Sequence, residues 1–139
     1  DASGPYNWIH NNYIDNCKYG IRSLFGSPNT IIQNNEITGS TSISGGAGIV
    51  LGSSPDAVVQ GNRILGNTSP SYIGIHLKYD TGSVWADGTI NNPGVPTNAT
   101  LTDNVVNNVT SGQRTLRKLY PKGSCTDFNK RSKQRSDVC

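Results

Sequence analysis

The sequence has few hydrophobic and few charged residues, no methionine and only three cysteines among 139 residues. Hydrophobic residues make up 33% of the chain and charged residues 15%, against about 45–50% (glycine included) and about 25% in an ordinary soluble domain. Coiled coils and helical bundles need alanine, leucine, glutamate and lysine at high density, so this composition excludes them. No run approaches the roughly 18 apolar residues of a transmembrane helix, and the sequence predicts no membrane span.

Charge is divided unevenly along the chain. Residues 1–110 carry four basic and seven acidic residues, a net charge of −3, whereas residues 111–139 carry eight basic and two acidic residues, a net charge of +6. The sequence therefore divides into a body and a basic C-terminal extension, which either folds along the acidic body or binds an anionic partner. Because few aromatic residues lie among its basic residues, we expect no nucleic-acid binding.

The three cysteines fit no zinc motif, and only two histidines are present to add ligands. Cys125 and Cys139 bracket a polar segment and are predicted to form a disulfide, which leaves Cys17 as a thiol or as a link to another chain. Glycosylation in a secretory pathway is permitted by three Asn-x-Ser/Thr sequons, at Asn67, Asn98 and Asn108. Together these features favour a secreted protein.

Four segments of the body repeat one pattern around a proline. The pattern is Pro-x-x-φ-φ-x-x-Asn-x-φ, in which φ is apolar and mostly β-branched. Its copies begin at Pro5, Pro28, Pro55 and, with one extra residue, Pro96. Short β-branched runs between glycine, asparagine, proline and serine are typical of strands joined by turns, and no run has a helical period. A second motif, Gly-Ile after an apolar or aromatic residue, places glycine at Gly20, Gly48 and Gly74.

These repeats predict a coil of two or three short strands per turn, with successive coils stacked in parallel about 4.8 Å apart. The repeated asparagine is expected to adopt the left-handed conformation at a corner and to hydrogen-bond to its copy on the next coil. This ladder would contain Asn12, Asn35, Asn62 and Asn104. The three motif glycines are expected to serve a second corner in the same way.

The repeats resemble those of the right-handed parallel β-helices of the pectate-lyase-like superfamily, which also occur in alginate epimerases, polysaccharide lyases and phage tailspikes. The resemblance covers residues 5–110 and implies an all-β fold, a parallel β-helix of about four coils. The resemblance assigns no catalytic residues to this chain, because the motifs of polygalacturonases, pectate lyases and mannuronan epimerases are absent. An open first coil would expose Trp8, Ile9 and Ile14, so we expect a missing segment, another chain or a second copy to cover it.

Chemically versatile side chains gather at and after the third Gly-Ile motif. The first outward position after the motif gives the column Arg22, Val50 and His76, and Lys78 and Tyr79 follow closely. Elimination or epimerisation of a uronate needs a cation, a base and an acid. Arg22 and Lys78 are candidates for the cation and the base, and Tyr79 or His76 for the acid. A second outward column, from His10 to Thr102, is polar and has no predicted role.

A long insertion, over about residues 78–95, follows this cluster and would form a wall beside it. Trp85, Asp80 and Asp87 are predicted to bind carbohydrate there. The two aspartates are also the only candidates for a carboxylate pair or for a weak Ca²⁺ site, and no other metal or cofactor is expected.

Two functions remain open, and whether the chain is an enzyme is open with them. The first is a carbohydrate-associated module of a secreted protein, similar to a polysaccharide lyase or epimerase, that acts on or binds an acidic polysaccharide. The second is a non-catalytic module that self-assembles or caps a larger β-helix in a fibre, spike or adhesin. The residues from His76 to Asp87 favour the first, and the absent catalytic motifs favour the second.

Overall fold

The computed structural model describes residues 4–39, 44–67, 71–80 and 94–109, which form eleven strands. The first sheet contains β1 (Trp8–His10), β4 (Ile31–Gln33), β7 (Val58–Gln60) and β10 (Thr100–Thr102). The second contains β2 (Tyr13–Cys17), β5 (Glu36–Gly39), β8 (Arg63–Leu65) and β11 (Val105–Asn107). The third contains β3 (Tyr19–Ser23), β6 (Gly46–Gly52) and β9 (Tyr72–Lys78). Within these ranges no helix is long and apolar enough to cross a membrane.

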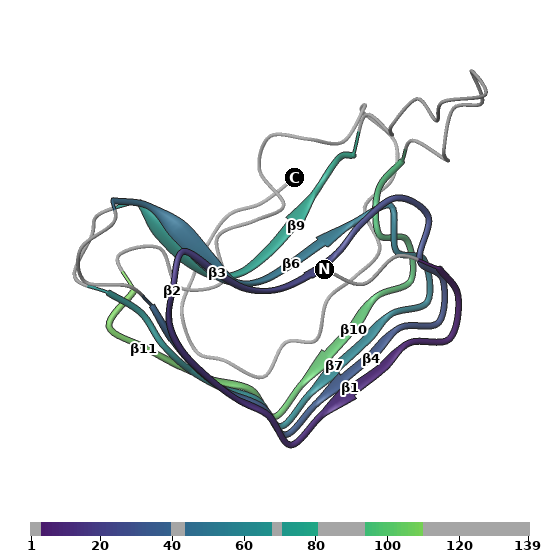
Figure 1. Cartoon of the computed structure of the whole chain (residues 1–139). Helices are drawn as coiled ribbons and strands as arrows, with labels where there is room; N and C mark the ends of the chain where they lie inside the picture. Colours follow the sequence, from purple (N-terminus) through teal and green to yellow (C-terminus); the bar gives the residue numbers. More distant parts are fainter. Residues whose placement is uncertain (1–3, 40–43, 68–70, 81–93, 110–139) are drawn as a thin grey trace, which may run out of the picture.

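Each strand lies beside the equivalent strand of the next coil, and every pairing between named strands is parallel. The chain therefore winds through the three sheets once per coil, which Figure 1 shows as a nested, three-sided outline. The register follows the sequence repeat, because Ile9 pairs with Ile32 and Ile32 with Val59. The prediction of an all-β parallel β-helix is confirmed.

The core consists of the inward-facing column of each sheet. Ile32 and Val59 fill it from the first sheet and Ile37 and Ile64 from the second, and all four are fully buried. Alternation along each strand places one residue inward and its neighbours outward. The β-branched residues of the repeat are therefore the residues that make the core.

The asparagine ladder lies at the corner between the first and second sheets. Asn35 Nδ2 donates to Asn62 Oδ1 at 3.0 Å and to the Ile9 carbonyl at 3.0 Å. Asn12 makes the same bond to Asn35, and Asn62 to Asn104, each at 2.9 Å. The amides of Asn35 and Asn62 are buried, so the ladder satisfies polar groups inside the corner.

The expectation about backbone conformation at this corner was wrong. The left-handed residue is the one before each ladder asparagine: Asn11, Asn34, Gly61 and Asp103, with φ between 53° and 64°. The ladder asparagine turns its side chain inward, while the preceding residue makes the bend. Asparagine, aspartate and glycine are the residues that tolerate this conformation, which explains the composition of that column.

The three motif glycines also have a different role from the one expected. They lie in β3, β6 and β9, and none of them has a positive φ. A Cβ on Gly20 or Gly48 would lie 2.5 Å from Cγ2 of Ile37 or Ile64 respectively. Glycine is required there because the third sheet approaches the core side chains of the second.

Several predictions fall outside the described residues. These are the disulfide between Cys125 and Cys139, the basic extension, and most of the insertion. Cys17 is a free thiol at the end of β2. Of the three sequons, Asn67 is buried, whereas Asn98 and Asn108 are exposed.

Candidate functional site

The outer face of the third sheet carries the column predicted from the sequence. Arg22 pairs with Val50, and Val50 with His76, so Arg22 and His76 are separated by one strand. The strand spacing puts their backbones about 10 Å apart. Val50, between them, is only 2% exposed. The buried Val50 therefore separates Arg22 from His76 on this face.

A basic and aromatic cluster lies at the N-terminal end of this face. Lys18 Nζ is 5.8 Å, and Arg22 Cζ 5.4 Å, from the centroid of the Tyr19 ring. Both distances are within the range of cation–π attraction. The cluster borders an open depression of about 410 Å³, lined by Cys17, Lys18, Tyr19, Gly20 and Arg22. We name Lys18, Tyr19 and Arg22 the basic cluster.

The fold positions this cluster through the start of β6. The Lys18 carbonyl accepts a hydrogen bond from the Ala47 amide at 2.9 Å, and the neighbouring Gly46 has a φ of 112°. A side chain on Gly46 would collide with the Lys18 carbonyl, so glycine allows the close approach. Lys18 and Tyr19 were not among the site residues predicted from the sequence. The signal was local, since two basic residues flank Tyr19 within five residues.

His76 and Lys78 lie on the same face, at the other edge of the sheet. Burial and the neighbouring Lys78 ammonium lower the pKa of His76 below its ordinary value of 6.5. The imidazole is therefore neutral at pH 7. Tyr79 follows Lys78 directly and is exposed. In neutral solution Lys78, and not His76, supplies the positive charge at this edge.

Asp80 lies in a different environment from the one expected for a sugar ligand. It is 5% exposed, and its Oδ2 accepts a hydrogen bond from the Phe25 amide at 3.0 Å. Its backbone pairs with Gly94 through two hydrogen bonds of 2.8 and 2.9 Å. Asp80 thus connects the first coil to the base of the insertion. The other predicted ligands, Trp85 and Asp87, lie outside the described residues.

One known protein family matches most of the chain. The family described as right handed beta helix region matches residues 2–114, which include all four repeats. The chain belongs to the right-handed beta helix family. Comparison with curated proteins and with solved structures gives no match. The family supports a β-helix module and names no substrate.

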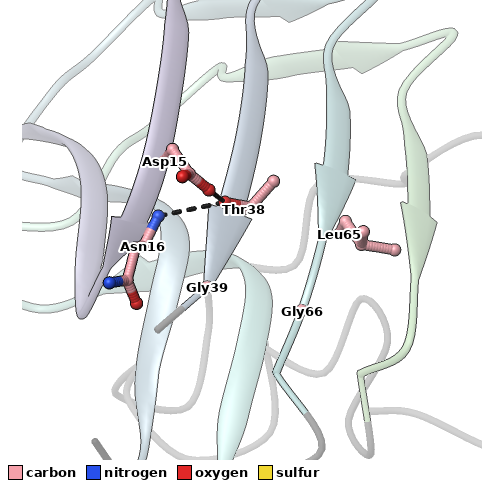
Figure 2. Close-up of a pocket in the computed structure, with 6 residues that line it drawn as sticks. All are labelled: Asp15, Asn16, Thr38, Gly39, Leu65 and Gly66. Atoms are coloured by element: carbon pink, nitrogen blue, oxygen red, sulfur yellow. Dashed lines mark hydrogen bonds between the residues drawn. The ribbon is translucent and has the colours of Figure 1, made fainter. Parts of the chain in front are cut away.

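A second depression of this β-helix, of about 340 Å³, lies at the ends of β2, β5 and β8 (Figure 2). The Thr38 hydroxyl donates to the Asp15 carboxylate, and the Asn16 amide donates to Thr38 Oγ1 at 3.0 Å. Among the described residues that line this depression, Asp15 is the only acid. In the parts of the chain that the structure describes, no group of three or more His, Cys, Asp or Glu side chains gathers to hold a metal ion.

Proposed function

We propose that this β-helix is a secreted, carbohydrate-associated module that binds an acidic polysaccharide at the exposed edges of the outer face of its third sheet. The basic cluster carries the proposal. Lys18 and Arg22 gather positive charge around Tyr19, which is 42% exposed and can hydrogen-bond to a sugar through its hydroxyl. The open depression beside them gives a sugar ring access.

The spacing of the positive charges suits a polymer better than a single sugar. Lys78 lies on β9, two strands from β3, and pairs with Gly52 of β6. A chain that runs across the strands advances about 4.8 Å per strand, a distance close to the length of one sugar ring. Because Val50 on β6 is buried, such a chain would contact the face only at its two edges, where Arg22 and Lys78 would meet carboxylates about two rings apart.

The same spacing favours binding over cleavage. Elimination needs a cation, a base and an acid around one sugar ring. The backbones of Arg22 and His76 lie about 10 Å apart, and the buried side chain of Val50 lies between them. A lyase or epimerase reaction would need further groups at one end of this face.

Affinity electrophoresis of the purified chain in gels containing polygalacturonate or alginate tests the proposal. We expect retardation that weakens as salt rises, because exposed charges are screened. Arg22→Ala should weaken binding about tenfold, the effect of one lost charge-assisted hydrogen bond. Arg63→Ala is the matched control, since it removes the same charge from the second sheet. Equal losses in both variants, or no retardation at low salt, would contradict the proposal.

Cleavage is tested in the same samples. Polygalacturonate and alginate incubated with the chain are monitored for the absorbance of unsaturated uronate ends, and alginate for a change in its uronate composition. We expect neither signal, since the three roles do not meet on one ring. A signal that grows with protein concentration and disappears in Arg22→Ala would make the module an enzyme.

A second candidate function is end-to-end assembly, and one observation favours it. Among the described residues, β1, β2 and β3 each pair on one side only, and Asn12 Oδ1 accepts no hydrogen bond. A further coil with an asparagine in register would extend the ladder there. Sedimentation velocity over a range of concentrations tests self-assembly. A monomer at every concentration would exclude stacking of identical copies.

A further inference from the structure

The outer face of the first sheet differs from the other two in charge. Its side chains form two columns with no lysine, arginine, aspartate or glutamate. The apolar column is Trp8, Ile31 and Val58, with Thr100 at its end, and the polar column is His10, Gln33, Gln60 and Thr102. The second sheet, by contrast, presents Glu36 and Arg63 outward, and the third presents Arg22 and Lys78.

The apolar column begins with a large exposed aromatic side chain. Trp8 is 63% exposed, and its ring stacks on His10 with centroids 4.1 Å apart and an interplanar angle of 29°. Ile31, the next residue of the column, is also among the exposed large hydrophobic residues. An indole held in place by stacking, next to an exposed isoleucine, is a flat apolar platform of the kind that binding sites present.

The polar column retains hydrogen-bonding groups that the fold does not use. Gln33 Nε2 lies 3.3 Å from Gln60 Oε1, which leaves Gln33 Oε1 as an acceptor and Gln60 Nε2 as a donor. Asn11 Nδ2 lies 3.1 Å from His10 Nδ1, which leaves His10 Nε2 available for a ligand. Donors and acceptors therefore run in a row parallel to the apolar column.

We infer that this face is a second carbohydrate site, for a neutral polysaccharide. A pyranose ring has an apolar face of C–H groups and hydroxyls around its rim. The apolar column matches the C–H face of the ring, and the polar column matches its hydroxyls. A sugar chain that runs across the strands advances about one ring per strand, with its first ring on Trp8. The lack of charged side chains disfavours an acidic chain here, so the two faces divide neutral from acidic glycan.

The experiment is affinity electrophoresis with three neutral polymers, hydroxyethyl cellulose, xylan and galactomannan, in low and high salt. At least one should retard the chain equally in both salts, since no charge is involved. Trp8→Ala should weaken this binding about tenfold or more, the effect of losing one stacked aromatic, and Trp8→Phe should retain most of it. Tyr13→Ala is the matched control, because Tyr13 is 69% exposed on the neighbouring sheet.

The two proposals fail separately. Trp8→Ala should leave binding to polygalacturonate unchanged, and Arg22→Ala should leave binding to the neutral polymer unchanged. The inference is overturned if no neutral polymer binds, or if Tyr13→Ala weakens binding as much as Trp8→Ala. It is also overturned if Trp8→Ala changes the sedimentation of the chain and not its glycan binding, since Trp8 would then belong to a protein interface. Thermal melting of each variant checks folding, which the exposure of Trp8 and Tyr13 should preserve.

Discussion

The first coil and the coil stacked on it have the same residue pattern but differ in burial. Ile9 and Ile14 occupy inward positions of the first coil and are half-buried, whereas Ile32 and Ile37, one coil later, are fully buried. An inward side chain is covered by the inward side chains of both neighbouring coils, and the described residues supply the first coil with one neighbour. A repeat therefore contributes to stability according to its place in the stack.

The two coils also differ on their outer faces. Exposed aromatic side chains concentrate in the first coil, at Tyr6, Trp8, Tyr13 and Tyr19. The second coil presents smaller or polar side chains at the paired positions, such as Ile31 opposite Trp8 and Glu36 opposite Tyr13. The first coil thus contributes less to the core and holds the aromatic residues of both proposed glycan faces.

The largest loss of stability is expected from substitutions in the core, and its size should differ between the two coils. Ile37→Ala should lower the free energy of unfolding by about 2–5 kcal/mol, because it opens a cavity in a fully covered site. Ile14→Ala should cost clearly less, since Ile14 is only half-buried. Urea denaturation measures the loss of stability in both variants, provided that the dependence of the unfolding free energy on urea concentration stays the same. Equal losses would show that the first coil is covered in solution.

The next largest loss of stability is expected from substitutions in the asparagine ladder. Asn35→Ala removes side-chain hydrogen bonds to Asn12, Asn62 and the Ile9 carbonyl, and should cost about 1–3 kcal/mol. Asn12→Ala should cost about 1 kcal/mol or less. Asn12 is exposed, and its backbone N–H, which the substitution leaves in place, still donates to Asn35 Oδ1. The thermal midpoints of the two variants provide the measurement. An unchanged midpoint for Asn35→Ala would mean that water replaces the ladder at no cost.

The smallest effect is expected on the outer face of the inner coils. Arg63 Nη1 lies 2.5 Å from Glu36 Oε1, and the two side chains are 56% and 43% exposed. Such a pair contributes about 0–1 kcal/mol, and salt screens it. Glu36→Ala should therefore shift the urea midpoint only slightly, and not at all in high salt. A larger loss that persists in high salt would show that outward positions, too, depend on their place in the stack.

The fold could be predicted from the sequence, and the candidate sites only in part. Arg22 and His76 were predicted to share a column, and they do, because the repeat sets the register. Lys18 and Tyr19 were missed although they lie close to Arg22 in the sequence, because the regular alternation of a strand would place positions 19 and 22 on opposite faces. Asp80 was expected to meet sugar, but its partner Phe25 is 55 positions away in the sequence.

By itself the sequence determined the β-helix. Alternating β-branched residues specify strands, and proline, asparagine and glycine at fixed spacing specify corners, because both preferences act within a few residues. Only the tertiary structure decided that Asn34, and not the ladder residue Asn35, adopts the left-handed conformation that bends the chain. The two residues have the same local preference, and the choice is made by hydrogen bonds to coils above and below. For the same reason Gly48 is needed for space beside Ile64 and not for its conformation, since only stacking brings the two together.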